Sequence, residues 1–386
     1  MRQVQQRHRL RRPSRALVGQ FLVLAFLLMF VYLLARVTES NLNARGIKTG
    51  FAFLAQTASL GISESWLPFA AGSDSYARVL LVGGANTIFV SALVIAIATA
   101  LGVAVGLSRL SSNWLLSRSA GLYVEVIRNV PLPLQLLLWY QILLNLPPPR
   151  QALRWGEAVA LSSRGLWLPG LAWDEFQLPE WVVVSLVMVL LATLGLGFAR
   201  WRAPRTRLPA SLRWVLLAAG VAGALGVVLS AEPRLEYPVL QGFNFQGGIS
   251  LSPELSALVA GLTLYAGAFI AEIVRAGVQS VPKGQWEAAH ALGLGRWHTL
   301  RLVVLPLSLR LIIPPLASEY LSTIKNSSLA VVIGYPELAS LINTMMSNTG
   351  QPIEGIAILM LAYLTISIPV GIFMNWYNRH SALVTR

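Results

Sequence analysis

Long apolar stretches separated by short polar segments dominate the pattern of this chain. About 20 apolar residues in a helix cross the roughly 30 Å hydrocarbon core of a bilayer. Eight stretches have this character, at 16–35, 85–107, 130–146, 181–199, 214–231, 255–274, 302–321 and 356–376. The pattern therefore predicts an all-α polytopic membrane protein with about eight transmembrane helices. A further apolar piece at 51–60 is too short to cross, and we expect it at the outer interface.

Composition agrees with a membrane protein. Of 386 residues, 55% are hydrophobic and only 12% are charged, with a mean hydropathy of +0.62. The formal net charge is +14, which in a soluble protein would suggest a nucleic-acid partner. Here we expect the excess Lys and Arg to mark cytoplasmic loops, with no nucleic acid bound. The chain has no cysteine, so disulfides and Cys-ligated metals are excluded.

The N-terminus predicts the orientation. Residues 1–15 carry six arginines and no acid, and the apolar run that follows is too long for a signal peptide. We therefore expect a retained first span, with an RNA-binding basic tail as the alternative. The segments then predicted to be cytoplasmic hold 20 Lys and Arg, against nine outside. This bias predicts that the N- and C-termini are both cytoplasmic.

The polar segment between the sixth and seventh predicted spans carries the strongest motif. It contains Glu287-Ala288-Ala289, a glycine six positions after the glutamate at Gly293, and then Val303-x-Leu305-Pro306. Residues this small let a partner surface approach the backbone, and Glu287 offers one charge for pairing. An ordinary polar loop is the alternative, and the full spacing argues against it.

This spacing resembles the EAA loop of the membrane subunits of binding-protein-dependent ABC importers. Three further stretches, 123–131, 265–277 and 318–330, resemble permeases of the polar amino-acid family (histidine, glutamine and arginine permeases). The resemblance covers about 85–146 and 250–380. It is greatest to the long permease of general L-amino-acid uptake systems, because of the layout of the chain.

The resemblance implies a five-helix permease core with an additional N-terminal helix and a two-helix insertion. The expected segments are 1–84 (basic N-terminus, first helix and periplasmic loop), 85–146 (first part of the core), 147–249 (inserted loop and hairpin), 250–380 (second part of the core with the coupling loop) and 381–386 (cytoplasmic tail). Because the insertion contains an even number of spans, the orientation of the core after it is unchanged.

The resemblance also implies partners. In the bacterial inner membrane, this subunit would pair with a second permease, expected to be a different homologous chain. Two copies of an ABC ATPase would bind ATP and Mg, so that no cofactor is bound here, and a periplasmic binding protein would deliver the amino acid. The residues expected to couple to the ATPase are Glu287, Ala288, Ala289, Gly293, Leu305 and Pro306.

Motifs for catalysis in this chain itself are lacking. Its three lysines follow Ile47, Pro282 and Ile324, whereas a phosphate-binding P-loop needs Gly-Lys-Ser/Thr. None of the four histidines forms a His-Glu-x-x-His motif, and no Gly-x-Ser-x-Gly is present. We therefore expect a pore subunit that is not an enzyme and holds no metal, with ATP hydrolysed by a partner.

Charged residues inside predicted spans are candidates for the substrate path. Arg310 lies about 12 Å into its span, followed by Pro314 and Pro315, and an arginine there could bind an α-carboxylate. Alternatively Arg310 pairs with Glu319 or extends to the inner interface. Further along the same segment, Glu319, Lys325 and Asn326 would line the outer gate, or form ordinary interfacial contacts. Glu272 and Arg275 have the spacing of a local helix pair.

Other functional classes remain open at this point. A stand-alone, ion-coupled secondary amino-acid transporter would also suit intramembrane charges. An integral membrane enzyme is disfavoured by the missing catalytic motifs, and a membrane scaffold is disfavoured by the patterned loop.

Overall fold

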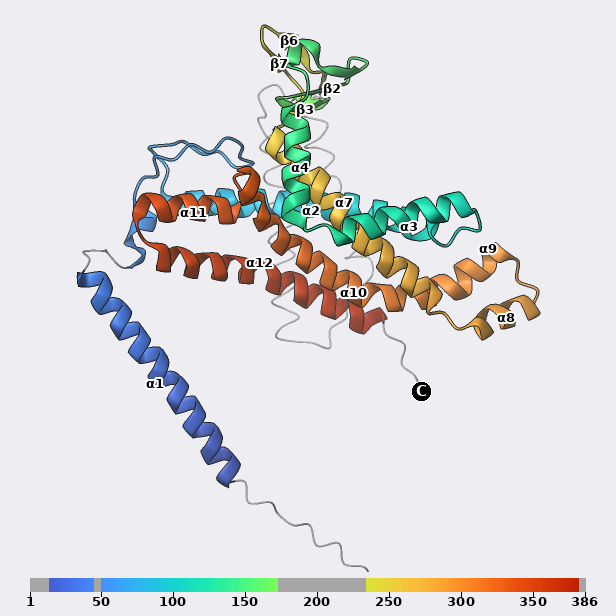
Figure 1. The fold of residues 1–386 in the computed structure, drawn as a ribbon, viewed down its shortest axis with the longest axis horizontal. Helices are drawn as coiled ribbons and strands as arrows, with labels where there is room; N and C mark the ends of the chain where they lie inside the picture. The colour runs from blue at the N-terminus through green and yellow to red at the C-terminus, as the bar shows by residue number, and fades with distance from the viewer. Residues whose placement is uncertain (1–13, 45–49, 173–233, 382–386) are drawn as a thin grey trace, which may run out of the picture. The chain divides into compact units, whose positions relative to one another are not determined.

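The computed structural model describes residues 14–44, 50–172 and 234–381. The described chain is mostly helical, as predicted (Figure 1). Within it, five helices contain a stretch long and apolar enough to cross a membrane: Gly19–Thr38, Tyr76–Ser108, Pro253–Gln279, Trp297–Ile333 and Pro352–Ile372. These stretches lie at five of the eight predicted spans.

None of the other three predicted spans is among these five helices. The one at 130–146 is helix α4, Leu132–Leu144, whose 13 residues extend about 20 Å, less than the hydrocarbon core. The two at 181–199 and 214–231, with the basic hairpin between them, lie outside the described residues. The number of eight spans therefore stays a prediction.

The helices alternate with short 3₁₀ and π turns. Their bounds are α1 Ser14–Ala44, η1 Phe51–Ala55, α2 Tyr76–Ser108, α3 Trp114–Asn129, α4 Leu132–Leu144, η2 Pro149–Gln151, α7 Pro253–Gln279, α8 Lys283–Ala291, α9 Arg296–Thr299, η3 Leu300–Val304, α10 Leu305–Asn326, η4 Ser327–Ile333, α11 Leu338–Thr349 and α12 Pro352–Ser381. The chain divides into two compact units, Met1–Phe89 with Pro336–His380 and Val90–Tyr335 with Ser381–Arg386. Helix α2 contributes its beginning to the first unit and the remainder to the second.

The core of the first unit is built from η1, the first turns of α2 and helix α11. Phe53, Ala58 and Leu60 are buried there with apolar residues of α2 and α11. The short apolar piece at 51–60 therefore packs into a protein core. Its depth relative to a membrane stays a prediction.

A buried carboxylate begins helix α11. Glu337 is fully buried and caps the helix by accepting the backbone N–H groups of Ala339 (2.9 Å) and Ser340 (2.7 Å). It also accepts the Tyr363 hydroxyl at 2.9 Å, while Thr87 Oγ1 accepts the N–H of Leu338. Burial raises the pKa of the Glu337 carboxyl, and these donors oppose the shift. The capping donors thus replace the water that burial removes.

Helix α7 is the centre of the second unit. A Cβ atom on Gly102 of α2 would lie 2.5 Å from Ile270 of α7, and one on Gly106 would lie 2.7 Å from the Ala271 carbonyl oxygen. On another side of α7, Gly277 leaves room for Ile312 of α10. Small residues therefore bring three helix backbones close together, the usual way in which helices pack in membranes.

Helix α3 forms between the predicted spans at 85–107 and 130–146, where the pattern predicted only a polar connecting loop. Asn113 caps it by accepting the N–H groups of Leu115 and Leu116, and it continues for 16 residues to Asn129. The chain bends at Pro131, and α4 leaves in a new direction (Figure 1). Because α3 mixes charged and apolar residues, no long apolar run indicated it.

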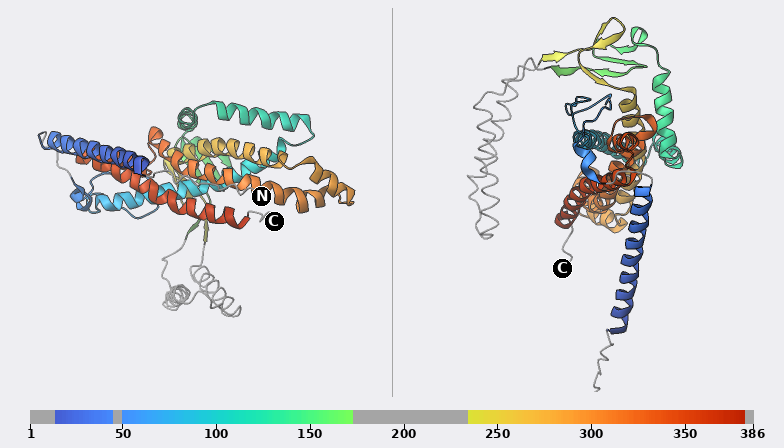
Figure 2. Two further views of the ribbon diagram at one scale, coloured as in Figure 1. Left: turned by 90° about the horizontal axis from the view of Figure 1, so that it is seen from below. Right: turned by 90° about the vertical axis from the view of Figure 1, so that its left-hand side faces the viewer.

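Short strands form in two segments that lie between predicted spans, at 153–172 and 234–251, an addition to the all-α expectation. They are β1 Leu153–Trp155, β2 Val159–Ser162, β3 Gly165–Leu168, β4 Gly170–Ala172, β5 Arg234–Glu236, β6 Val239–Gln241, β7 Asn244–Gln246 and β8 Ile249–Leu251. The largest sheet is antiparallel in the order β1-β2-β3-β8, and β8 leads directly into α7. Figure 2 shows the strands at the ends of α4 and α7.

The pairing of β4 with β5 places the two points that flank residues 173–233 side by side. Gly170 pairs with Glu236 and Ala172 with Arg234 in antiparallel register. The chain therefore leaves and re-enters the described structure at neighbouring points. This geometry allows an insertion without separating the elements on either side of it.

We expect Gly102→Ala to destabilise the chain by about 1–3 kcal/mol, because the added methyl group overlaps Ile270. Gly84→Ala is the matched control: Gly84 is in the same helix, but no atom lies within 4 Å of its Cβ position. Thermal unfolding of the purified full-length variants in detergent measures the stability of each variant. Equal midpoints for the two variants would contradict the close α2–α7 packing.

Candidate functional site

The motif at 283–306 folds as two short helices at the tip of the second unit. Helices α8 and α9 lie beyond the end of α7 and the start of α10 (Figure 1). Glu287 and Ala288 are exposed on α8, as a docking role requires. Ala289 is only 3% exposed, so it faces the protein and not a partner.

The structure explains why position 293 is a glycine, which the motif spacing alone did not. It ends α8 with a φ of 75°, in the left-handed region. The N–H of Gly293 donates to His290 O and that of Leu294 donates to Ala289 O, which is the Schellman arrangement. A side chain other than glycine or asparagine is strained in this conformation. The glycine thus fixes the turn that directs the chain into α9.

The sequence pattern did not single out several large apolar side chains at the same tip. Leu292 is 81% exposed and Trp297 is 68% exposed, and Leu300 is also exposed. Apolar residues in a polar segment were the signal that could have revealed them. Together with Glu287 they form an exposed surface of mixed character, which suits contact with another protein better than contact with water.

Leu305 and Pro306 lie where the backbone changes from a π turn to α10. The N–H of Leu305 donates to Leu300 O, five residues earlier, and both residues are exposed. Pro306 has no N–H, so an ordinary helical bond is missing at this point. π turns of this kind are frequent at functional sites.

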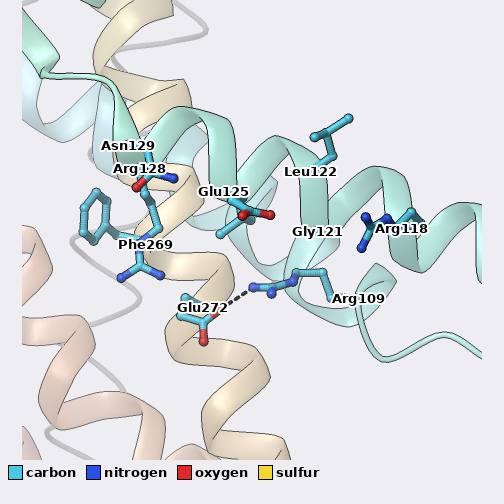
Figure 3. Close-up of a pocket in the computed structure, with 10 residues that line it drawn as sticks. Arg109, Arg118, Gly121, Leu122, Glu125, Arg128, Asn129, Phe269 and Glu272 are labelled. Carbon is cyan, nitrogen blue, oxygen red and sulfur yellow. Dashed lines mark hydrogen bonds and ion pairs between the residues drawn. The ribbon is translucent and has the colours of Figure 1, made fainter.

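A cavity of about 650 Å³ opens where α3 packs on α7 (Figure 3). Arg128 of α3 and Phe269 of α7 line it, with the guanidinium carbon 4.9 Å from the ring centroid. A neighbouring cavity of about 380 Å³ shares Arg128 and Phe269 and extends to Leu311 and Pro315 of α10. Three helices therefore surround one charged, aromatic-lined space.

Two carboxylates, Glu125 of α3 and Glu272 of α7, line these cavities, while Glu319 of α10 lines neither of them. Glu319 is half-buried, and Arg128 is close enough to influence its charge. Tyr265, whose ring lies 4.9 Å from that of Phe269, is within electrostatic reach of both. Within the described residues no ion pair joins Arg128 to Glu319. An arginine and a glutamate thus face the same region without neutralising one another directly.

The other residues predicted for the substrate path lie along α10. The Nη1 atom of Arg310 is buried and has no hydrogen-bond partner among the described residues, and Arg310 lines neither of the two cavities above. It forms no ion pair with Glu319 among the described residues, and its role stays a prediction. Lys325 is exposed and Asn326 half-buried at the end of the helix. The helix continues through Pro314 and Pro315.

Arg128 was missed because its segment was predicted to be a loop.

The pair of Glu272 with Arg275 is confirmed, and Arg109 at the end of α2 joins it (Figure 3). No group of three or more His, Asp or Glu side chains in the described part of the chain could hold a metal ion.

Comparison with known proteins agrees with this arrangement. The family model "Binding-protein-dependent transport system inner membrane component" matches residues 96–382. The amino-acid ABC transporter permease protein YhdX of Escherichia coli strain K12 is 44% identical over 379 residues, covering 96% of this chain and 95% of that protein.

Two further relatives match over similar lengths. The general L-amino acid transport system permease protein AapQ of Rhizobium johnstonii is 40% identical, covering 96% of this chain and 93% of that protein. The glutamate/glutamine/aspartate/asparagine transport system permease protein BztB of Rhodobacter capsulatus is 35% identical, covering 96% and 95%. These alignments extend through the insertion as well as the core.

We expect Gly293→Ala to lower the hydrogen-exchange protection of the Leu294 amide by about fivefold or more, because a left-handed alanine costs about 1–2 kcal/mol. Gly293→Asn is the matched variant, since asparagine tolerates this conformation. It should keep most of the protection. Equal loss in both variants would contradict a capping role and favour one that depends only on small size.

Proposed function

Because this chain belongs to the family of inner membrane components of binding-protein-dependent transport systems, we propose that it is the permease subunit of an ATP-driven amino-acid importer. The observation that carries the proposal is the exposed α8–α9 tip, which holds Glu287 and Ala288 at the spacing of the EAA loop. In this role the chain forms the translocation path and does not hydrolyse ATP.

The partners follow from this role. Two ATPase subunits bind ATP and Mg, and each docks on the loop of one permease. A second, homologous permease completes the pore, and a periplasmic binding protein delivers the substrate. The chain spans the bacterial inner membrane several times with both termini in the cytoplasm, which the distribution of Lys and Arg supports.

Coupling then works by moving the tip. Closure of the ATPases draws the two loops together, and the helices attached to them tilt as rigid bodies, so that the path opens outward. Exposed Leu292 and Trp297 supply apolar contact area around the charge of Glu287. Leu305 and Pro306 lie where this movement enters α10.

The cavity between α3, α7 and α10 suits a zwitterion. An amino acid carries a carboxylate and an ammonium group a few ångströms apart, whatever its side chain. Arg128 can bind the carboxylate with two hydrogen bonds. Glu319, which lines neither cavity but lies within electrostatic reach of Arg128, can accept the ammonium group. Phe269 lines the space beside Arg128, and the ring of Tyr265 packs against that of Phe269. Recognition of the common groups is what a general amino-acid permease needs.

The remaining charged and polar residues of α10 extend this path. Arg310 has a buried guanidinium nitrogen without a partner among the described residues, so it is the second candidate for the carboxylate. Lys325 and Asn326 lie at the other end of the helix, at the proposed outer gate.

Glu287→Lys should lower amino-acid uptake by about tenfold or more, because a charge of the wrong sign faces the ATPase. Glu157→Lys is the control, since Glu157 is exposed on the turn between β1 and β2. Uptake of labelled amino acid by cells is measured alongside the amount of permease in the membrane. Normal uptake by Glu287→Lys at a normal membrane level would refute the coupling role.

Arg128→Gln and Glu319→Gln should each raise the apparent KM for uptake by about tenfold to a hundredfold, the effect of losing one charged hydrogen bond. Arg164→Gln, at an exposed position between β2 and β3, controls for loss of charge. An unchanged KM in both site variants would remove this cavity from the path. If Arg310→Gln raises KM and Arg128→Gln does not, the carboxylate contact belongs to α10.

Reconstitution separates this function from a stand-alone, ion-coupled transporter. The purified chain alone in liposomes should not accumulate amino acid in response to an ion gradient. Uptake should require the ATPase, the second permease and the binding protein together. Ion-driven accumulation by the chain alone would favour the secondary transporter.

A further inference from the structure

A second charged cavity, of about 510 Å³, lies next to the one in Figure 3, where α2 ends and α3 begins. Its lining is rich in guanidinium and hydroxyl groups and contains no carboxylate. These groups belong to Arg109, Arg118, Arg275, Ser111, Ser112 and Ser117. Arginine and serine side chains are hydrogen-bond donors that suit phosphate oxygens.

The positive charge of this cavity is only partly balanced. Glu272 pairs with both Arg109 and Arg275. Arg118, by contrast, is exposed and makes no hydrogen bond or ion pair within the described residues. The lining itself therefore holds three arginines and no carboxylate. Glu125 lines the adjoining cavity together with Arg118 but forms no ion pair with it, so the Arg118 guanidinium is free to bind an anion.

The backbone adds to the attraction. Helix α3 begins at Trp114 beside the cavity, so its positive end contributes to the field there. Trp114 is 75% exposed, and the cavity lies where the apolar stretches of α2 and α7 end. An exposed indole at the end of two spans is typical of the level of lipid headgroups.

We propose that this cavity binds the phosphate group of an anionic phospholipid headgroup. The phosphate bridges Arg118 of α3 to Arg109 of α2 and Arg275 of α7, while Trp114 lies at the interface beside it. Since α7 ends at Gln279 and α8 begins at Lys283, the bound lipid braces the base of the α8–α9 tip. Free phosphate shares this chemistry, and lipid is favoured because the cavity lies at the ends of two spans.

The test compares lipids on the full-length chain, purified in a neutral detergent. Phosphatidylglycerol or phosphatidylcholine is added, and the lipid retained after gel filtration is measured by mass spectrometry. We expect phosphatidylglycerol to be retained selectively. Arg118→Gln should weaken retention about fivefold, the effect of one basic residue at an anionic surface. Arg118→Lys keeps the charge and should retain most of it, and Arg164→Gln should match the unmodified protein.

Each outcome bears on the proposal. Equal retention of phosphatidylglycerol by the unmodified protein and Arg118→Gln would overturn it, as would equal retention of the two lipids. Displacement of phosphatidylglycerol by millimolar inorganic phosphate alone would overturn the assignment of the ligand as a lipid and indicate a site for free phosphate. Circular dichroism checks that Arg118→Gln is folded. The inference does not rest on the transport proposal, so failure here leaves the uptake experiments unaffected.

Discussion

The close approach of α2 to α7 is the constraint on which the second unit depends. Lipid tails are as apolar as leucine, so burial of apolar surface does not by itself draw helices together in a membrane, and close packing must do so. Gly102 and Gly106 allow that packing. At the end of the same contact Arg109 meets Glu272, so a row of small residues determines where these half-buried charges can be compensated.

Features that depend on long, regular patterns could be predicted from the sequence. Apolar runs of helical length located five spans, and the spacing from Glu287 to Pro306 located the exposed tip. Features that depend on distant partners could not be predicted. The strands have three or four residues each, and β3 is completed by β8, some eighty positions later. The cap at Glu337 likewise needs Thr87 and Tyr363, which no local pattern connects to it.

The residues of the candidate site likewise fall into those that the sequence pattern indicated and those that it did not. An arginine within an apolar run, such as Arg310, stands out in the sequence because its charge is unexpected there. Arg128 did not stand out, because α3 is half polar and also carries Arg118 and Glu125. Its role emerges only when α3 packs on α7 and the guanidinium lies over Phe269. Gly293 shows a different limit. The motif spacing pointed to this residue, but a glycine is required there because the backbone is left-handed, and spacing carries no information about backbone conformation.

Helices α7 and α10 connect the tip to the cavity in different ways. From Pro253 to Gln279, α7 has no internal proline, and it carries Tyr265, Phe269 and Glu272 on one continuous helix. By contrast, α10 begins after a π turn and contains Pro314 and Pro315, which are the points at which helices bend. A displacement of the tip is therefore expected to reach Phe269 as a rigid movement of α7 and to reach Glu319 as a bend in α10. Because Phe269 and Glu319 are attached to helices of unequal stiffness, moving the tip must change the distance between them.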